Sequence, residues 1–538
     1  MPDNDKQETL AAPSWFPRDL WMEQRGKYRH YHRWFNGDIL RVKKQVAKGV
    51  VYKFPLRVNF IKDFAFKRAK MLFGEVPENS DQPLVRTVTR PRNPLRGGKP
   101  SQDDKKFATF LQNVVNEVWL QSGGRSLQMQ NGVLSQYLGG CVFRLVWDET
   151  SEYLNIPLQV EVIRPDFFFP IPNGRDPYDL LECWVAWQIP AEQAKTQFGV
   201  DAAPGTSVTY GEHWTKGIGE TKGRYQVYVG EEKVKDEYGE PFDLEHDFGF
   251  IPFVYIPNKR ASGYFGQSIV DDMEGVCLEY NARLADRGTA AQNSAFRKRY
   301  VWNMGQGAPT QVQLSEGTTA TFLGNETPNA KNTPGIQFED PPKDANLESI
   351  TDDLFSQALK SGALPPVAYG VDEGSQRSGQ TLLIRFWPLT ADVSIQRHFW
   401  TDGLNRFAWM ICKMLAVKQF KIEGESIPED FGVRVNFNQE WKSFLPPDRE
   451  QKTNEYVQRR AQDGMSTETF IKGFGDINDV EEEIERIDAE KQADADRAMQ
   501  QMQLRADTFN NNSDKAGDSK NGASPDKKPV NQQEDKKE

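Results

Sequence analysis

A long, uninterrupted helical pattern in the middle of the chain limits the folds that are open to it. From Gln267 to Ala295 apolar residues recur every three or four positions, and no proline breaks the run. A helix of this length would extend roughly 40 Å at about 1.5 Å per residue. A second helical pattern runs from about Ala345 to Lys360, and residues 298–344 between the two contain short strand-like stretches and turns. The sequence therefore predicts two helices that bracket a small insertion.

Other helices and several strands are predicted before this pair. A helix at Asn59–Leu72 has Ile61, Phe64, Arg68 and Leu72 on one face and ends at Gly74, and another begins at Ser101. Runs of β-branched and aromatic residues bounded by glycine, proline or asparagine predict strands at 141–148, 158–163, 183–189, 224–229 and 253–256. The first half of the chain is thus expected to mix helices with strands.

A second long helical pattern follows the pair, from Ser378 to about Leu415. It contains Pro388, which removes a backbone hydrogen bond and clashes with the preceding turn, so a kink is predicted there. After a strand-like segment at 433–441, helical turns begin near Asp448, Ser466 and Asn478 and indicate a small helical C-terminal domain.

Length and composition favour a protein of several parts. At 538 residues the chain is too long for one compact core. Hydrophobic residues make up 38% of it and aromatic residues 12%, which is enough apolar material for folding and for subunit interfaces. No window approaches the roughly 18 uncharged apolar residues of a membrane span, and the first residues do not form a signal peptide. We therefore expect a protein that is neither secreted nor membrane-embedded. Residues 1–17 and 506–538 are polar and are expected to be flexible.

The net charge of −10 argues against a protein that coats nucleic acid, because coating needs a clustered basic surface. It does not exclude DNA as a cargo. A channel that lets DNA slide should hold it weakly, and a mostly acidic or neutral wall with a few cationic positions meets that need.

Motifs for catalysis, metal binding and nucleotide binding are not evident. The chain contains no GxxxxGK[ST], HExxH, GxSxG or GxGxxG, and GIGETKG at 217–223 is better explained as a hairpin turn. His30 and His32 would not face each other on a helix, so a packing or surface role is favoured over metal ligation. We expect no catalytic residue, no metal and no cofactor. The cysteines are scattered and are expected to be buried small apolar residues: Cys141, Cys183, Cys277 and Cys412.

Two acidic clusters have a simpler explanation than chemistry. Asp271, Asp272 and Glu274 lie near the start of the long helix, and 481–483 lie in the first turn of a C-terminal helix. The helix dipole favours negative charge at both places. A metal site at the first cluster would need Asp271 and Asp272 on one face, and neighbouring helical residues point to different faces.

Two basic features remain open to two interpretations each. Arg297, Lys298 and Arg299 follow the long helix and either complement its C-terminal dipole or contact DNA or a partner. Arg377 lies in a Gly- and Ser-rich loop and is either a solvated charge or, if the loop faces a channel, a phosphate contact.

The order of several segments resembles that of the tailed-bacteriophage portal, or head-to-tail connector, family. The match covers about residues 38–492, and its motifs, each weak alone, occur in the family's order: QNGVLSQYLGGCVFRLVWD, VEVIRPDFFFPIPN, FGFIPFVYIPN, SIVDDMEGVCLEYNARLADRGTAAQNSAF, RSGQTLLIRFWPL and FLPPDREQKTNEYVQRRAQDGMSTETFIKGFG.

The resemblance implies an α+β portal-type ring subunit with an α/β wing, a two-helix stem, a small α/β clip and a helical crown. Carried onto this sequence, these parts are the N-terminal wing at 18–266, stem helices at 267–297 and 345–361, the clip at 298–344, a tunnel loop at 362–378, the rest of the wing at 379–445 and the crown at 446–505. The tunnel loop would place Ser375, Gln376, Arg377 and Ser378 beside DNA.

The implied function is that of a non-enzymatic ring, a dodecamer in the virion, at one capsid vertex. It would pass double-stranded DNA without sequence specificity during packaging and ejection. Its partners would be the large terminase subunit, head-completion or adaptor proteins, and the major capsid and scaffold proteins, with no membrane. Assembly would take place in the host cytoplasm. The alternatives are a structural virion adaptor that conducts no DNA, and a nuclease, which would need a metal-binding carboxylate cluster that is not evident.

Overall fold

The computed structural model describes most of the chain between Trp15 and Ser513. The described residues are 15, 18–40, 57–74, 82–93, 99–217, 219, 221–235, 242–295, 299–302, 311–315, 318–323, 335–338, 346–369, 379–443, 449–461, 464, 466, 469–471 and 480–513. The chain divides into two compact units, Met1–Pro446 and Pro447–Glu538.

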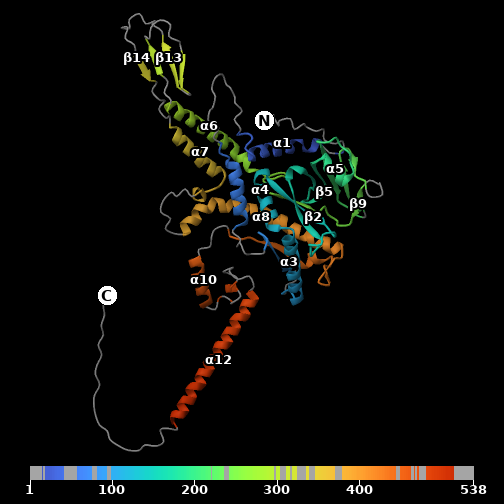
Figure 1. Cartoon of the computed structure of the whole chain (residues 1–538). Coiled ribbons are helices and arrows are strands. Elements are labelled where there is room, and N and C mark those ends of the chain that lie inside the picture. Colours follow the sequence, from blue (N-terminus) through green and yellow to red (C-terminus); the bar gives the residue numbers. More distant parts are fainter. Residues whose placement is uncertain are drawn as a thin grey trace, which may run out of the picture. The chain divides into compact units, whose positions relative to one another are not determined.

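The first unit mixes helices with several antiparallel sheets (Figure 1). Its helices are α1 Arg18–Phe35, α2 Phe60–Phe73, α3 Gln102–Gln121, α4 Gly124–Leu138, α5 Ala191–Phe198, α6 Ile269–Ala295, α7 Leu347–Ser361, α8 Gly379–Val417 and α9 Phe431–Arg434, with short 3-10 turns η2 Pro165–Phe167 and η3 Pro366–Tyr369. The second unit contains α10 Arg449–Ala461 and α12 Val480–Ser513.

The strands that the structure describes pair into five sheets. They are β1 Arg86–Pro91, β2 Gly140–Trp147, β3 Leu158–Ile163, β4 Phe168–Asn173, β5 Asp176–Pro190, β6 Ser207–Thr215, β7 Gly223–Val229, β8 Glu232–Lys233, β9 Asp243–His246, β10 Phe253–Pro257, β11 Arg299–Trp302, β12 Gln311–Ser315, β13 Thr318–Leu323, β14 Gly335–Phe338, β15 Lys421–Ile422, β16 Glu425–Ser426 and β17 Val435–Glu440. The sheet orders are β1-β17, β10-β2-β3, β12-β13-β11-β14, β15-β16 and β4-β5-β6-β7-β8, with β9 also on β7.

Local capping signals explain where the early helices begin and end. The Asn59 side chain accepts a hydrogen bond from the Lys62 amide at the start of α2, and Gly74 closes that helix with a positive φ. Ser101 and Asp104 form a reciprocal capping box at the start of α3. The helices predicted at Asn59–Leu72 and from Ser101 are confirmed.

The main hydrophobic core lies between these helices, the three-stranded sheet and α8. Trp34, Trp119, Phe143, Trp400 and Phe407 are among its fully buried aromatic side chains. The four cysteines are free and buried, as the sequence predicted. Burial of such large side chains stabilises the core by about 1.5–3 kcal/mol each.

Side-chain amides from two helices complete the open edge of β1. The Asn116 amide accepts from the Thr87 N–H at 3.0 Å and donates to the Thr87 carbonyl at 2.9 Å. Gln128 makes the same pair of bonds with Val85, at 3.0 and 3.4 Å, and Gln112 accepts from the Thr89 N–H at 3.2 Å. Each side-chain amide takes the position that a peptide group of an additional strand would occupy beside β1. The buried backbone groups of β1 therefore have hydrogen-bond partners without a further strand.

Replacing Asn116 by leucine is expected to lower the free energy of unfolding by about 1–3 kcal/mol, because the Thr87 N–H and carbonyl would stay buried without partners. The Thr87 amide should also exchange its hydrogen faster. Urea unfolding and hydrogen exchange measure the two effects. Asn113→Leu, at an exposed position of the same helix, is the matched control, and equal losses in the two variants would contradict this account of the edge.

The six-stranded sheet holds the N-terminal Trp15 against one face. The Trp15 ring stacks on Trp184 and Tyr228, and its Nε1 donates to the Gly230 carbonyl at 2.8 Å. A Cβ at position 211 would lie 2.1 Å from the Trp15 ring, so Gly211 provides the space. Trp15 falls within the segment 1–17, for which composition predicted flexibility, and this contact supplies the apolar anchor that the composition did not indicate.

The strands predicted from the sequence are present in these sheets. The five predicted segments correspond to β2, β3, β5, β7 and β10. The predicted hairpin turn at 217–223 joins the antiparallel strands β6 and β7, whose register pairs Thr215 with Arg224. That prediction is confirmed.

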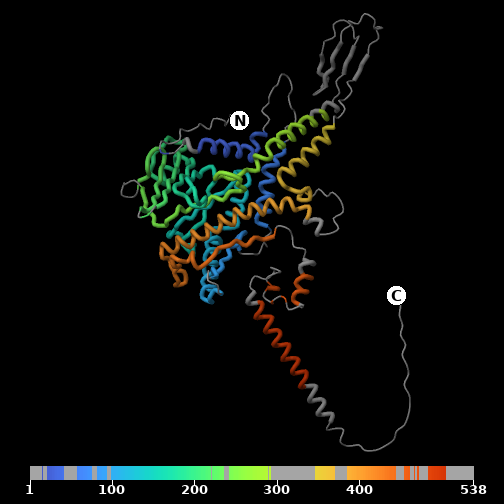
Figure 2. The backbone as a smooth tube through the Cα atoms, turned by 180° about the vertical axis from the view of Figure 1, so that it is seen from behind, coloured from blue at the N-terminus to red at the C-terminus, as the bar shows by residue number. Residues whose placement is uncertain are grey.

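Helices α6 and α7 lie side by side in both views (Figure 1, Figure 2). The Arg287 guanidinium of α6 forms an ion pair with Glu348 at 3.0 Å, so the end of α6 lies beside the start of α7 and the two helices are antiparallel. The strands β11–β14 lie between them in the chain. The prediction of two helices that bracket a small strand-containing insertion is confirmed.

Helix α8 runs from Gly379 to Val417 with Pro388 inside it. The helix continues through this proline, and the kink stays a prediction. In the second unit, the Thr469 amide is capped by the Ser466 hydroxyl at 3.2 Å, as a helix start at Ser466 predicts. Helix α12 continues to Ser513 and so enters the segment 506–538, where disorder was predicted. Of residues 506–513 only Ala506 is a strong helix former, so the extension past that boundary comes from propagation of the long helical run before it, in which each added residue gains one backbone hydrogen bond.

Candidate functional site: the segment between α7 and α8

The segment 362–378 is the candidate site, because the resemblance to portal proteins implies that its residues face DNA. Of it, 362–369 is described. Ser375, Gln376, Arg377 and Ser378 lie outside the described residues.

The basic run after α6 is described only at its end. Arg297 and Lys298 lie outside the described residues, and Arg299 opens β11, paired with Ala320 and Phe338. Whether these residues contact DNA stays a prediction.

A buried arginine on α2 connects the beginning of this segment to α8. The Arg68 side chain is 2% exposed, and its Nη1 donates to the Gly362 carbonyl at 2.7 Å. Its Nη2 forms an ion pair with Asp392 on α8. Its Nε donates to Gln136 Oε1 on α4 at 3.1 Å. One guanidinium therefore holds the first residue of the segment and the helix that follows it.

Asp392 receives a second cation from a different part of the chain. Lys259, in the connection between β10 and α6, forms an ion pair with the other carboxylate oxygen of Asp392. A carboxylate that accepts from two cations is well stabilised in a partly buried place. The Asp392 carboxylate thus links α8 to the connection that leads into α6.

A second arginine fastens α8 to the end of α2. Arg397 Nε donates to the Leu72 carbonyl at 2.9 Å, and its Nη2 donates to the Lys442 carbonyl at 2.8 Å. Burial lowers the pKa of Arg397 to about 10. Gln396, one residue earlier, accepts from Gln136 at 3.3 Å. The stretch of α8 from Asp392 to Arg397 is therefore bound to α2 and α4 by several polar contacts.

The two ends of the described part of the segment, Gly362 and Tyr369, pack on α2. The Tyr369 hydroxyl donates to Asp63, and Lys67 Nζ lies 3.3 Å from the centre of the Tyr369 ring. Burial, and then the hydrogen bond and charge of Asp63, raise the pKa of Tyr369. A Cβ at Gly362 would lie 2.2 Å from the buried Phe64 ring, so only glycine fits there. The chain is thus fixed on α2 up to residue 369.

The acids at the start of α6 bind α1 and hold no metal constellation. Asp271 accepts from the Tyr31 hydroxyl at 2.9 Å, and Glu274 accepts from Trp34 Nε1 at 3.0 Å. His30 Nε2 lies 2.6 Å from the same Glu274 oxygen. The cluster fastens α1 to α6. Within the described ranges, no three His, Cys, Asp or Glu side chains are grouped as a metal site would require.

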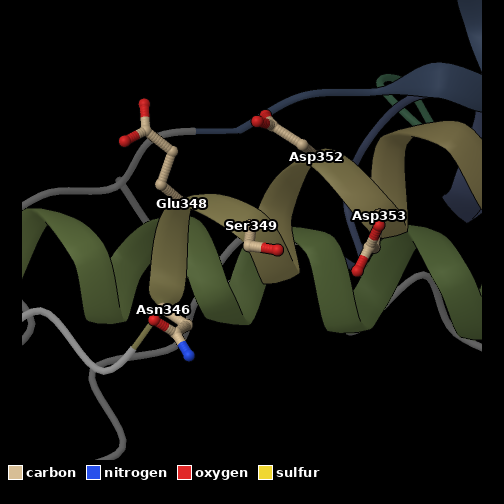
Figure 3. A pocket seen from close by; sticks show the side chains of 5 residues that line it. All are labelled: Asn346, Glu348, Ser349, Asp352 and Asp353. Carbon is tan, nitrogen blue, oxygen red and sulfur yellow. The ribbon is translucent and has the colours of Figure 1, made fainter.

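An open polar hollow lies at the start of α7. Figure 3 shows Glu348 and Asp352, one turn apart, on one side of the helix. Ser349 and Asp353, each one residue further along, lie on the adjacent side. Asn346 completes the lining. Glu348 is already paired with Arg287 of α6. The hollow is a surface feature of the start of α7, and its lining residues include no lysine, arginine or histidine beside the acids.

The Arg68 network was not predicted as a site. The sequence placed Arg68 on the apolar face of its helix together with Ile61, Phe64 and Leu72, and an arginine on such a face is the signal that could have found it. A buried arginine needs partners, and the pattern gave no means of naming Asp392 or Gly362.

The arrangement is that of a structural protein, with polar networks that position segments. Residues 194–497, more than half of the 538-residue chain, match the model of a family described as phage portal protein, SPP1 Gp6-like. The chain therefore belongs to the phage portal protein family. No curated protein sequence matches it.

Family membership confirms the resemblance and sets the coarse function. Portal proteins are structural, non-enzymatic proteins of the virion and act in the context of capsid DNA packaging. The family implies a ring oligomer located at the capsid vertex. Among the described helices, none combines the length and the apolar character needed to cross a membrane.

Proposed function

We propose that copies of this chain form a ring that conducts double-stranded DNA into and out of the capsid, with the segment 362–378 facing the channel. The observation that carries the proposal is the Arg68 network, in which one buried guanidinium holds both Gly362 and α8. A loop that meets moving DNA needs rigid supports, and this network fixes the first residue of the segment and, through Asp392, the helix that follows it.

The parts of the ring are proposed as follows. The α6–α7 pair would be the stem, residues 298–344 between them the clip, residues 18–266 and 379–445 the wing, and residues 446–505 the crown. The clip would be the docking site of the packaging ATPase and later of head-completion proteins. Arg297, Lys298 and Arg299 enter the clip and are candidates for contacts with DNA or with these partners.

An apolar stripe on α8 supports assembly into a ring. Ile384, Trp387 and Ile395 are 74%, 71% and 49% exposed, and their spacings of three and eight residues place them along one side of the helix. Large side chains exposed in a row mark interaction surfaces. In a ring each copy presents one face to the next, so the stripe is a candidate for that contact.

Electron microscopy of the purified protein, alone and with its capsid scaffold, tests the proposal. Rings with an open centre wide enough for a duplex are expected. Single particles or closed rings in both conditions would favour the alternative, a structural adaptor that conducts no DNA.

Changing Arg377 to glutamate tests the segment itself. If the loop contacts phosphates, rings should still form and the amount of packaged DNA should fall, measured as DNase-protected DNA in an in vitro packaging assay. Arg175→Glu, an exposed arginine in the turn between β4 and β5, is a control with the same charge change. Equal packaging by both variants and the unchanged protein would contradict a channel role for Arg377.

A further inference from the structure

The two-stranded sheet of β1 and β17 presents one face to solvent, and that face is basic. Side chains alternate between the two faces of a strand, and the register pairs Arg86 with Glu440, Val88 with Asn438 and Arg90 with Asn436. The Arg92 amide donates to the Arg434 carbonyl at 2.8 Å and extends the pairing by one row. The outer ribbon face is defined by Arg86, Val88, Arg90, Arg92, Arg434, Asn436, Asn438 and Glu440.

The arginines of the outer ribbon face are mostly not neutralised. Arg434 is paired with Asp104 at 3.2 Å. Arg86, Arg90 and Arg92 form no ion pair with any residue that the structure describes. Four arginines thus face one glutamate, on a chain whose net charge is −10. Elsewhere arginines such as Arg68 and Arg144 are engaged by carboxylates. The outer ribbon face therefore carries an excess of positive charge.

The ribbon is rigid, because its other face is fixed to the core. Thr87 Oγ1 donates to Gln439 Oε1 at 3.2 Å between the strands, and the side-chain amides of Asn116, Gln112 and Gln128 hold the free edge of β1. Arg92 Nε donates to the Val435 carbonyl at 3.2 Å, which orients that guanidinium. Groups that are held in place lose little freedom when they bind a ligand.

We propose that the outer ribbon face binds the phosphate backbone of duplex DNA, at a site separate from the segment 362–378. Arg90 and Arg92 are alternate residues of one extended segment, so they stand about 6.6–6.8 Å apart on the same face. Basic side chains gathered on one face are what contact with the phosphate backbone of DNA requires. Guanidinium groups bind phosphate through two donors, and the amides of Asn436 and Asn438 add further donors.

The site reads no sequence, because phosphate contacts carry none. The edge of β1 is already occupied by side-chain amides, so an extended peptide cannot add there as a strand, and a polyanion that lies across the face fits better than an acidic segment that pairs with the edge. The inference rests on the proposed function in one respect only, which is that this protein works next to duplex DNA.

The test compares DNA binding by full-length assembled protein and by the Arg90→Gln/Arg92→Gln variant. Affinity for a short fluorescent duplex is measured by anisotropy at several salt concentrations. Each lost phosphate contact lowers the slope of log affinity against log salt by about 0.9, so the double variant should lose about 1.8. The control is Lys195→Gln/Lys222→Gln, in which both lysines are exposed, Lys195 on α5 and Lys222 in the turn before β7, and it should keep the slope.

Three outcomes would overturn the ribbon site. An unchanged slope in the ribbon variant means that DNA does not use this face. If the ribbon variant loses binding to poly-glutamate while its DNA binding is unchanged, the face binds an acidic protein instead. Dissociation of the ring, seen by electron microscopy, assigns it to the contact between copies. Open rings that package DNA while the slope is unchanged would reject the ribbon and leave the proposed conduit intact, so the two proposals fail separately.

Discussion

Replacing Arg68 by methionine is expected to lower the free energy of unfolding of the first unit by about 3–5 kcal/mol, because removing one partner of a buried ion pair leaves the other charge uncompensated. Asp392 would keep Lys259 alone. The Gly362 carbonyl and the Gln136 side chain would each lose a donor. Methionine fills a similar length, so the loss reports polar contacts more than an empty cavity.

The measurement is urea unfolding followed by tryptophan fluorescence, since buried Trp34, Trp119 and Trp400 belong to the same core. Lys70→Met is the matched control. It removes a cation from an exposed position of the same helix and should change stability by less than about 0.5 kcal/mol. Similar losses in the two variants would show that the Arg68 contacts do not hold the core together.

A double-mutant cycle separates the ion pair from the other bonds of Arg68. If Arg68 and Asp392 act as a pair, Arg68→Met combined with Asp392→Leu should cost less than the sum of the single changes, with a coupling of about 0.5–3 kcal/mol. Strict additivity would mean that Arg68 acts through Gly362 and Gln136 alone. The cycle therefore tests directly whether α2 and α8 are joined by charge.

Sequence patterns predicted the elements whose signals are local. Asn59 and Gly74 delimit α2 because a cap acts within one turn, and Ser101 opens α3 for the same reason. The strands were found because β-branched and aromatic runs bounded by turns need no distant partner to be recognised. The same locality let the proline-free helical run and its strand-containing insertion be predicted together.

Contacts between distant residues could not be predicted in this way. Arg68 and Asp392 are 324 positions apart, and neither lies in a motif that names the other. Asn116 occurs in an amphipathic helix, where a polar residue is normally assigned to solvent, yet it is 9% exposed and completes a sheet edge. In both cases the side chain is polar at a buried position, and only the fold shows which backbone or charge it satisfies.

A second buried ion pair joins two sheets of the first unit. Glu212 of β6 is 2% exposed and accepts from Arg144 of β2 at 3.0 Å. It also accepts from the Tyr210 hydroxyl at 2.8 Å and from Trp214 Nε1 at 3.0 Å. Since β2 belongs to the three-stranded sheet and β6 to the six-stranded sheet, this carboxylate is a link between them.

Replacing Glu212 by alanine is expected to lower the free energy of unfolding by about 3–5 kcal/mol, because the Arg144 guanidinium would stay buried with only the more distant Glu161 at 3.8 Å. The loss should fall mainly on the six-stranded sheet. Tryptophan fluorescence, to which Trp184, Trp187 and Trp214 of that sheet contribute, should then change at lower urea than far-ultraviolet circular dichroism, which follows the helices.

Two variants decide whether the charge or the side-chain volume matters. Glu212→Gln keeps the shape and one acceptor, so its loss of unfolding free energy should be smaller than that of Glu212→Ala. It should still be larger than that of Glu245→Ala, an exposed change on β9 of the same sheet. If glutamine matched the unchanged protein, hydrogen bonding by the carbonyl would be sufficient and the charge of Glu212 would contribute nothing. If fluorescence and circular dichroism moved together in the alanine variant, the two sheets would unfold as one unit, and the pair would stabilise the whole unit instead of the junction alone.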